Sequence, residues 1–385
     1  MPVLPFVVEG YGAEEWVYGL LLTLYSVFQF IGAPYLGAMS DRIGRKPVLL
    51  ISQAGTLLCW VVFLIALFLP ETPILGFALP LWIIALARIF DGITGGNTSV
   101  ANAYVADITT REEKSYIFGY LGGIVGLGLI IGPGLGGVTA SSSIGVKGTI
   151  LTAMAISILA LLSIFMWLKE SHQPAKKGTV KRQSILQSIF ILRRIRKVNP
   201  KPLIKLLFGM KFIFSTMMAF YISTIPLFLI DLFSFDEREL GSFMLVVGIF
   251  LAFNQAFLAK RFVIRVGEFN TLLFGLLFSV IGLFCITITD NFWLYISFYY
   301  IMNLGISLVL PTFNSLIAIH ANPEKQGEIM GISDSLNSFA MALFPVVAAS
   351  IYGVIMYKVY FFITALPLAA LLIALFMRKR LHIKN

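Results

Sequence analysis

Charged residues are scarce in this sequence: Asp, Glu, Lys and Arg make up only 12% of its 385 residues, whereas 58% are hydrophobic. Soluble globular domains average about a quarter charged residues and about half apolar ones. The composition therefore excludes a soluble enzyme or a nucleic-acid binder and predicts a membrane protein. The apolar residues suffice for about eleven or twelve helices of about 20 residues each. They occur in long runs rich in Leu, Phe and Gly without strict alternation, which favours helices over a β-barrel.

Residues that build disulfide, metal or nucleotide sites are also few. The two cysteines, Cys59 and Cys285, lie within apolar runs and indicate no disulfide framework. The three histidines lie in polar connections, and no G-x-x-x-x-G-K-[ST] run occurs. We therefore expect no metal site, no cofactor and no enzymatic activity. Any pumping would draw on an ion gradient, with the proton gradient as the expected energy source, or on a separate ATPase chain.

Apolar windows bounded by charged and turn residues predict eleven complete membrane spans. They lie near residues 16–39, 47–69, 79–105, 115–139, 148–168, 204–230, 239–259, 269–288, 292–318, 326–356 and 359–377. Residues 1–8 are apolar as well but cover only about 12 Å of a hydrocarbon core about 30 Å thick. We predict an all-α membrane protein of two six-helix halves. The halves are residues 1–168, with an incomplete first helix, and residues 203–385, joined by a basic linker at 169–202.

The basic residues predict the orientation of these spans. Most of the 29 lysines and arginines lie in the linker, the C-terminus and every second connection, whereas Lys147, Arg238 and Lys358 lie in the opposite connections. The positive-inside rule then makes the basic connections and the C-terminus cytoplasmic. The net charge of +10 thus reflects topology and attraction to anionic lipid headgroups of the bilayer, not a nucleic-acid partner.

One connection carries a distinctive pattern of glycine and charge. Its residues, at the end of the first complete span, are Gly37, Asp41, Arg42, Gly44, Arg45 and Lys46. The glycines permit a tight turn, and Asp41 lies close to the start of the next helix, where negative charge is favoured. A weaker copy, residues 256–261, follows the corresponding span of the second half. Related halves of this kind are common in secondary transporters, with the substrate site between them.

A glycine-rich run lies within the predicted span near 115–139. It consists of Gly119, Gly128, Gly132, Pro133, Gly136 and Gly137. Three of these glycines recur every four residues and share one helix face, which lets a neighbouring helix approach closely. The proline removes a backbone donor and bends the helix. Small-residue packing alone is a sufficient explanation of the pattern.

Arg88 and Asp91 lie near the middle of one predicted span. Counted from Pro80 at 1.5 Å per residue, they lie about 12 Å and 16 Å deep. An Arg at that depth costs about 2.5–3.5 kcal/mol, so it needs a polar partner, and Asp91 lies on the same helix face. The two residues form either a self-neutralising structural pair or a proton-coupling pair. Thr98 and Asn102 extend the same face, as the wall of a cavity would.

Asp334 is the second acid that lies well inside a span. If Arg88 pairs with Asp91, no obvious basic residue neutralises Asp334. Lys205 and Lys211, near the inner end of the span at 204–230, are expected to extend toward the aqueous interface. An unpaired buried carboxylate favours its neutral form. We therefore predict a proton-coupling or cation-binding carboxylate; the alternative is a hydrated acid in a cytoplasmic vestibule. The other candidate cavity residues are Gln29, Asn254, Asn303 and Asn337.

These motifs resemble those of the major facilitator superfamily. The connection at 37–46 resembles its signature loop, which implies that Asp41 docks against a helix of the other half and helps to hold one gating state. The glycine run resembles the antiporter motif of its drug–proton exchangers, a mark of exporters more than importers. The segment around Arg88 resembles the fourth-helix motif, whose arginine tunes proton transfer. The whole chain is most similar to the tetracycline-resistance group. Residues 104–109 and 170–172 also resemble segments of that group.

The resemblance implies a proton-coupled exporter of a small amphipathic compound or drug. It implies a monomer in a bacterial cytoplasmic membrane that works by alternating access. A sugar or metabolite transporter on the same fold is an alternative, and a non-transporting membrane sensor or scaffold is another. Residues 1–5 resemble the outer end of the family's first helix, so we expect either a true start upstream of Met1 or a shortened transporter.

Overall fold

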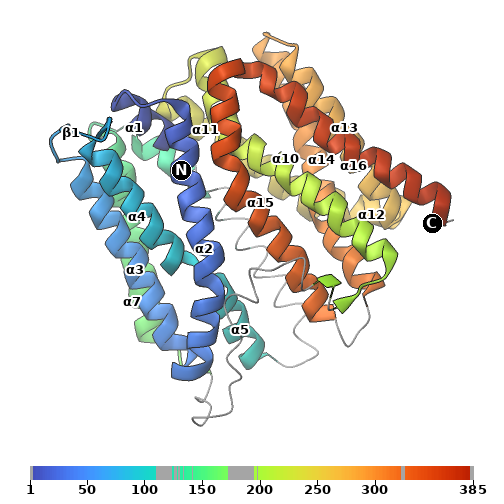
Figure 1. The fold of residues 1–385 in the computed structure, drawn as a ribbon, viewed down its shortest axis with the longest axis horizontal. Helices are drawn as coiled ribbons and strands as arrows, with labels where there is room; N and C mark the ends of the chain where they lie inside the picture. The colour runs from blue at the N-terminus through green and yellow to red at the C-terminus, as the bar shows by residue number, and fades with distance from the viewer. Residues whose placement is uncertain are drawn as a thin grey trace. The chain divides into compact units, whose positions relative to one another are not determined.

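The computed structural model describes residues 3–109, 124, 128, 131–132, 134–140, 142–171, 195–196, 198–321 and 326–381. These residues are almost entirely helical and divide into two compact units, Met1–Phe190 and Ile191–Asn385. A two-stranded hairpin of β1 (Pro73–Ile74) and β2 (Phe77–Ala78) is the sheet within this part of the chain. Figure 1 shows the helices and their order along the chain.

The first unit is built on helices that share long interfaces. Its helices are α1 (Leu4–Gly10), α2 (Glu15–Ile43), α3 (Arg45–Ala66), α4 (Leu79–Gly95), α5 (Thr98–Ile108) and α7 (Val146–Trp167). α2 and α3 both pack on α4, and α7 packs on α3 (Figure 1). The α2–α4 contact is so close that a Cβ atom on Gly32 would lie 2.5 Å from the Ile93 carbonyl oxygen. Small residues at such positions let the backbones of membrane helices approach.

The second unit contains longer helices. They are α10 (Pro202–Phe233), α11 (Glu237–Phe253), α12 (Lys260–Val266), α13 (Glu268–Thr287), α14 (Phe292–His320), α15 (Gln326–Ile355) and α16 (Val359–Leu381). A π-helical segment, Asn254–Ala259, joins α11 to α12, and a 3₁₀ turn, Met356–Lys358, joins α15 to α16. α13 packs on α14 and α16, while α10 packs on α15 and α16. Buried Tyr295 and Tyr299 lie among the aromatic side chains of this unit.

The all-α membrane fold predicted from the composition is confirmed. Nine stretches of the described chain are long and apolar enough to span a membrane, and one of them, Ile329–Arg378, holds both α15 and α16. Ten predicted spans thus have a helical counterpart. The predicted span at 115–139 falls mostly outside the described residues, as does most of the linker at 169–202.

The predicted repeat of the 37–46 connection is misplaced by several residues. Residues 256–261 are helical, because no helix-breaking residue interrupts the chain until Gly267. The equivalent turn lies at Gly267, which joins α12 to α13 with φ 79° and ψ 165°. Gly44 joins α2 to α3 with φ 101° and ψ 159°, so the two turns share one backbone conformation. Both positive φ values favour glycine, which has no Cβ atom.

Candidate functional site

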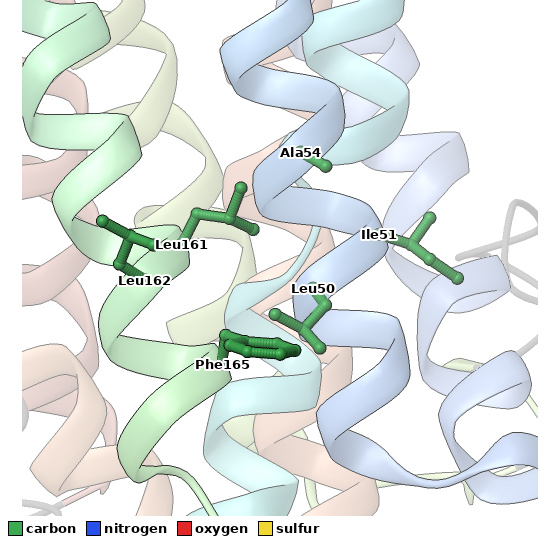
Figure 2. A pocket seen from close by; sticks show the side chains of 6 residues that line it. All are labelled: Leu50, Ile51, Ala54, Leu161, Leu162 and Phe165. Atoms are coloured by element: carbon green, nitrogen blue, oxygen red, sulfur yellow. The ribbon is translucent and has the colours of Figure 1, made fainter.

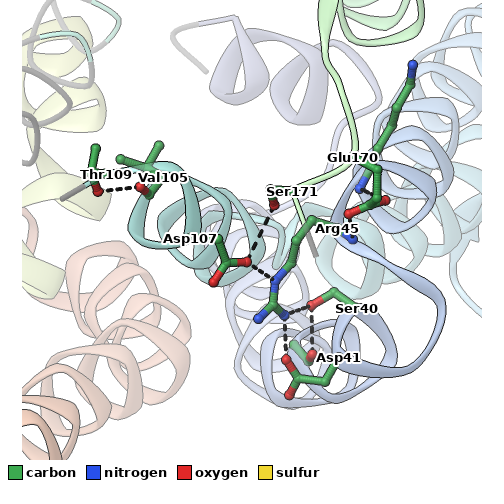
Figure 3. Close-up of polar contacts among 10 residues, drawn as sticks. Ser40, Asp41, Arg45, Val105, Asp107, Thr109, Glu170 and Ser171 are labelled. Atoms are coloured by element: carbon green, nitrogen blue, oxygen red, sulfur yellow. Dashed lines mark hydrogen bonds and ion pairs between the residues drawn. The ribbon is translucent and has the colours of Figure 1, made fainter. Parts of the chain in front are cut away.

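The turn at Gly44 is closed by a carboxylate from a distant part of the chain. Glu170, just beyond the end of α7, accepts hydrogen bonds from the backbone N–H groups of Arg45 and Lys46 at 2.8 and 3.1 Å (Figure 3). These are free N–H groups of the first turn of α3, where a negative charge is favourable. A Cβ atom on Gly44 would lie 2.5 Å from Glu170 Oε2. Glycine is therefore favoured at this position by φ, and a residue with a Cβ atom would also have to displace the Glu170 carboxylate.

The Arg45 side chain connects three segments at the same end of the unit. Its Nη1 donates to Asp41 Oδ1 at 2.5 Å and to Ser40 Oγ at 2.6 Å, and its Nε donates to Asp107 Oδ2 at 3.0 Å (Figure 3). Ser171 Oγ also donates to Asp107, at 3.4 Å. Arg45 is only 8% exposed. Its planar fork suits such multiple contacts, because its donors diverge in fixed directions.

A cluster of buried apolar residues packs together the helices whose ends carry Asp41, Arg45 and Asp107. Leu36 of α2, Val48 and Leu49 of α3 and Val100 of α5 are buried against one another, with Ile164 of α7 packed beside them. Lys46 extends along α7, where its Nζ donates to the Phe165 carbonyl oxygen at 2.9 Å. We name Asp41, Arg45, Asp107 and Glu170 the charge cluster. Asp107 and Glu170 were not among the predicted site residues, because nothing in their spacing links them to residue 45.

The other residues of the predicted connection contribute less to this geometry. Arg42 is exposed, and Gly37 faces Ser99 at ordinary contact distance, 3.8 Å from an added Cβ atom. Asp41 is 44% exposed at its side chain and bonded to Arg45 within its own unit. Its predicted docking against the other half stays a prediction.

Arg88 and Asp91 form a buried pair on α4, as their spacing predicts. Arg88 Nη1 lies 3.6 Å from Asp91 Oδ2, and their side chains are only 9% and 12% exposed. The guanidinium carbon lies 5.8 Å from the ring centres of Tyr25, Trp60 and Phe63. Aromatic faces attract a cation at such distances, and more strongly when water is excluded. The arginine is thus held by rings of α2 and α3 as well as by its carboxylate.

The neighbouring polar residues connect this pair to α2 and α3. Gln29 Nε2 donates to Tyr25 Oη at 3.0 Å and to the Gly95 carbonyl oxygen at 3.3 Å. Thr56 on α3 hydrogen-bonds to Asp91. Gln29, a predicted cavity residue, is thus bonded to Tyr25, the ring that lies near Arg88. Thr98 and Asn102 lie farther along, exposed on α5.

Two predicted cavity residues of the second unit bond to each other. Asn254 Nδ2 donates to Asn303 Oδ1 at 3.4 Å, and Tyr300 Oη donates to Asn254 Oδ1 at 3.0 Å. Asn303 Nδ2 in turn donates to the Val247 carbonyl oxygen at 3.4 Å. Both asparagines are buried, at 0% and 3% exposure. This junction ties the π-helical segment to α14.

The prediction that Asp334 lacks a basic partner is wrong. Lys211 Nζ lies 3.5 Å from Asp334 Oδ1 and donates to Asn314 Oδ1 at 2.8 Å and Ser333 Oγ at 2.6 Å. Lys211 is 5% exposed, so it is turned into the helix bundle instead of extending toward water. The two residues are far apart in sequence, and only the packing of α10 on α15 brings them together. Asn337, three residues beyond Asp334, is half-buried on α15.

The glycine-rich run is described only in part. Gly119 and Pro133 lie outside the described residues, Gly128 and Gly132 are exposed, and Gly136 and Gly137 are buried. The Gly136 carbonyl oxygen accepts a hydrogen bond from Thr149 of α7 at 2.8 Å. The buried end of the run therefore packs on the start of α7.

A pocket of about 390 Å³ opens between α3 and α7. Its lining is entirely apolar and consists of Leu50, Ile51, Ala54, Leu161, Leu162 and Phe165 (Figure 2). No lining side chain carries a charge or a hydrogen-bonding group, so these side chains can make only apolar contacts with a ligand. Within the described residues, no group of three or more His, Cys, Asp or Glu side chains is arranged to hold a metal ion.

Comparison with known proteins agrees with this architecture of long apolar helices and buried charge pairs. The family model of the Major Facilitator Superfamily matches residues 1–345, and the chain belongs to this family. It is therefore a membrane transporter and not an enzyme, as predicted.

Its relatives include several efflux proteins. The class D tetracycline resistance protein of Salmonella ordonez is 31% identical over 92% of this chain and 85% of its own length. The class C protein of Escherichia coli is 28% identical with the same coverage. The quinolone resistance protein NorA of Staphylococcus aureus is 24% identical, again over 92% and 85%.

Two solved structures share the fold. A bacterial homologue of the human lysosomal transporter Spinster, in an inward-facing and unoccupied conformation, superposes with a TM-score of 0.75 at 12% identity. The match covers 98% of this chain and 92% of that one. The human organic anion transporter MFSD10 (TETRAN) superposes with a TM-score of 0.69 at 24% identity, over 92% of this chain and 83% of that one. At these identities the likeness establishes the fold alone.

Proposed function

We propose that this chain is a proton-coupled antiporter that exports a small amphipathic compound or drug. The observation that carries this proposal is the buried Arg88–Asp91 pair, nearly excluded from water and held at 3.6 Å. Close charge-assisted contacts are about 2.7–2.9 Å long. A carboxylate held at this longer distance retains capacity to accept a proton while the aromatic rings around Arg88 continue to stabilise the guanidinium. The names of the relatives, tetracycline and quinolone resistance proteins, support export.

In this proposal two helical halves, residues 1–168 and 203–385, alternate access to a midplane site, with the basic linker 169–202 between them. The charge cluster acts at the gating connection. The protein works as a monomer in the bacterial cytoplasmic membrane, driven by the proton gradient and without a cofactor. The basic connections and the C-terminus face the cytoplasm.

Proton movement in everted membrane vesicles tests the proposal. Respiration acidifies the vesicle interior, and addition of tetracycline or of a quinolone should release protons from it through this protein. Asp91→Asn should abolish drug-evoked proton release, because the amide cannot exchange a proton. Asp290→Asn, which neutralises an exposed loop acid, is the matched control and should keep the wild-type response.

The alternative functions give different outcomes. Proton uptake with a sugar or metabolite would identify an importer in place of an exporter. No response of the wild type to drugs, sugars or metabolites would favour a sensor or scaffold. Undiminished drug-evoked proton release by Asp91→Asn would remove Asp91 from the coupling mechanism.

A further inference from the structure

Lys211 is a buried cation in the second unit that the Arg88–Asp91 pair does not involve. It lies nine residues after the start of α10, about 14 Å along the helix axis. Its exposure is 5%. A lysine placed inside a membrane-spanning helix is costly, and such residues mark substrate or ion pathways. The groups that Lys211 binds must therefore offset the cost of burying its charge.

The three partners of Lys211 differ in closeness and in exposure. Asn314 and Ser333 are neutral, and their oxygens lie 2.8 and 2.6 Å from Nζ. Asp334 is the charged partner, but it lies at 3.5 Å and its side chain is 71% exposed. An ammonium has three donors, so two are held closely and the third faces a weakly held, hydrated carboxylate. The 3.5 Å separation is longer than a close charge-assisted contact of about 2.7–2.9 Å, so another anion can displace the exposed Asp334 carboxylate.

Ser215 provides a second hydrogen-bond donor beside this position. It lies one turn after Lys211 on the same face of α10, where side chains are about 5–6 Å apart at Cβ. Its hydroxyl oxygen is buried, the residue is 1% exposed, and no described residue hydrogen-bonds to it. Buried hydroxyls are normally hydrogen-bonded. A carboxylate that accepts from Lys211 with one oxygen can accept from Ser215 with the other.

Aromatic rings continue from the same helices. Phe212 follows Lys211, and its ring stacks with that of Phe339 on α15 at 6.2 Å and 30°. Phe344, one further turn along α15, lies 6.2 Å from Phe212 and 5.9 Å from Phe220. Phe339 remains 41% exposed, so part of this aromatic surface is available for contact. A flat apolar body attached to a carboxylate matches it.

We propose that Lys211 and Ser215 form an anion subsite that receives the carboxylate of an amphipathic aromatic acid, which displaces Asp334. This inference rests on the proposed function, because it names the chemical class of the exported compound. All of its residues belong to α10, α14 and α15 of the second unit. Asp334 thereby competes with the ligand for Lys211.

Equilibrium binding to the purified, detergent-solubilised full chain tests the proposal. The probes are 2-naphthoate and its neutral analogue 2-naphthamide, followed by naphthalene fluorescence. The wild type should bind naphthoate at least tenfold more tightly than naphthamide. Lys211→Met should lower naphthoate affinity at least tenfold and leave naphthamide affinity unchanged. Lys205→Met, an exposed lysine on the same helix, is the matched control and should change neither.

Two further variants separate ligand binding from a structural role. Asp334→Asn should raise naphthoate affinity about fivefold, because the competing carboxylate is removed; a purely structural ion pair would show no such gain. Ser215→Ala should lower naphthoate affinity about fivefold with naphthamide unchanged. It also tests the subsite if Lys211→Met does not fold.

The proposal is overturned if the wild type does not prefer naphthoate, or if Lys211→Met binds it as the wild type does. It is also overturned if Asp334→Asn and Ser215→Ala leave naphthoate affinity unchanged. Binding is measured without a membrane gradient, so these outcomes are independent of proton release from vesicles. Drug-evoked proton release with no preference for naphthoate would keep the proposed function and reject the anion subsite.

Discussion

At the scale of single residues, Arg45 illustrates how a cation is held at the end of a helix. Its guanidinium contacts Asp41, Ser40 and Asp107 in three directions, while its backbone N–H donates to Glu170. The side chain thus links α2 and α5 to the start of α3, and the backbone N–H adds the segment after α7. A point charge in its place cannot reach all of these oxygens, because a lysine ammonium lacks the planar fork.

Arg45→Lys should therefore destabilise the protein although the charge is retained. We expect a loss of about 1–2 kcal/mol, since charge-assisted hydrogen bonds contribute about 1.5–3 kcal/mol each and lysine keeps part of them. The measurement is the midpoint of thermal unfolding of the purified protein in detergent. Arg42→Lys, at an exposed neighbouring position, is the control and should leave the midpoint unchanged. Equal midpoints for the two variants would show that the charge alone accounts for the role of Arg45.

At the scale of helices and turns, the two compact units contain the same turn with different neighbours. Gly44 and Gly267 have similar backbone angles, and each directly follows the end of a helix. The N–H group of each glycine donates to the carbonyl oxygen four residues earlier, which belongs to Ser40 and Val263 respectively. A Cβ atom on Gly44 would meet Glu170, whereas one on Gly267 would meet no described atom within 4 Å. The turn is thus repeated in the second unit, but among the described residues a carboxylate caps the turn at Gly44 and none lies within 4 Å of a Cβ atom on Gly267.

This difference predicts unequal effects of the same substitution. Both Gly267→Ala and Gly44→Ala should lose about 1–3 kcal/mol of stability to backbone strain at positive φ. Gly44→Ala should lose more than Gly267→Ala, because its methyl group must also displace Glu170. Thermal midpoints of the two variants provide the comparison. Glu170→Ala should lower the thermal midpoint less in the Gly44→Ala variant than in the wild type, because the hydrogen bonds of Glu170 to the start of α3 are already disturbed there. Fully additive losses would contradict the cap.

The contact of α2 with α4 offers a second test at this scale. Gly32→Ala places a methyl group 2.5 Å from the Ile93 carbonyl oxygen, so the helices must separate, at a cost of about 1–3 kcal/mol. Gly209→Ala on α10 meets open space and should be neutral or stabilising by up to about 1 kcal/mol, since alanine favours helix more than glycine does. Thermal midpoints that fall equally for both variants would argue against a close helix contact at Gly32.

At the scale of the whole molecule, the distribution of charge predicts which connections face the cytoplasm. Single-cysteine variants in a background with Cys59→Ser and Cys285→Ser report this directly. Arg261→Cys should react with a membrane-impermeant maleimide in everted vesicles, and Asp290→Cys should react in right-side-out vesicles, since positive connections stay inside. Both positions are exposed, so labelling is limited by sidedness and not by burial. The reverse labelling pattern would invert the proposed orientation.

The residues of the candidate site were predictable only where their partners are close in sequence. Arg88 and Asp91 are three residues apart on one helix, so periodicity alone places them on one face. Asp107 and Glu170 escaped prediction because their contact with the 41–46 connection depends on how α5 and the end of α7 are placed. Lys211 was assigned to the wrong environment for the same reason: its partner Asp334 lies on α15.

The sequence by itself determined that this protein is a bundle of apolar membrane helices, because apolar run length, glycine position and local charge spacing are properties of neighbouring residues. It also determined the superfamily, through motifs that lie within single connections or helices. Only the tertiary structure decided which charges meet. Pairing of Arg45 with Asp107 and of Lys211 with Asp334 depends on helix packing across long separations in the chain, and local spacing carries no information about such packing.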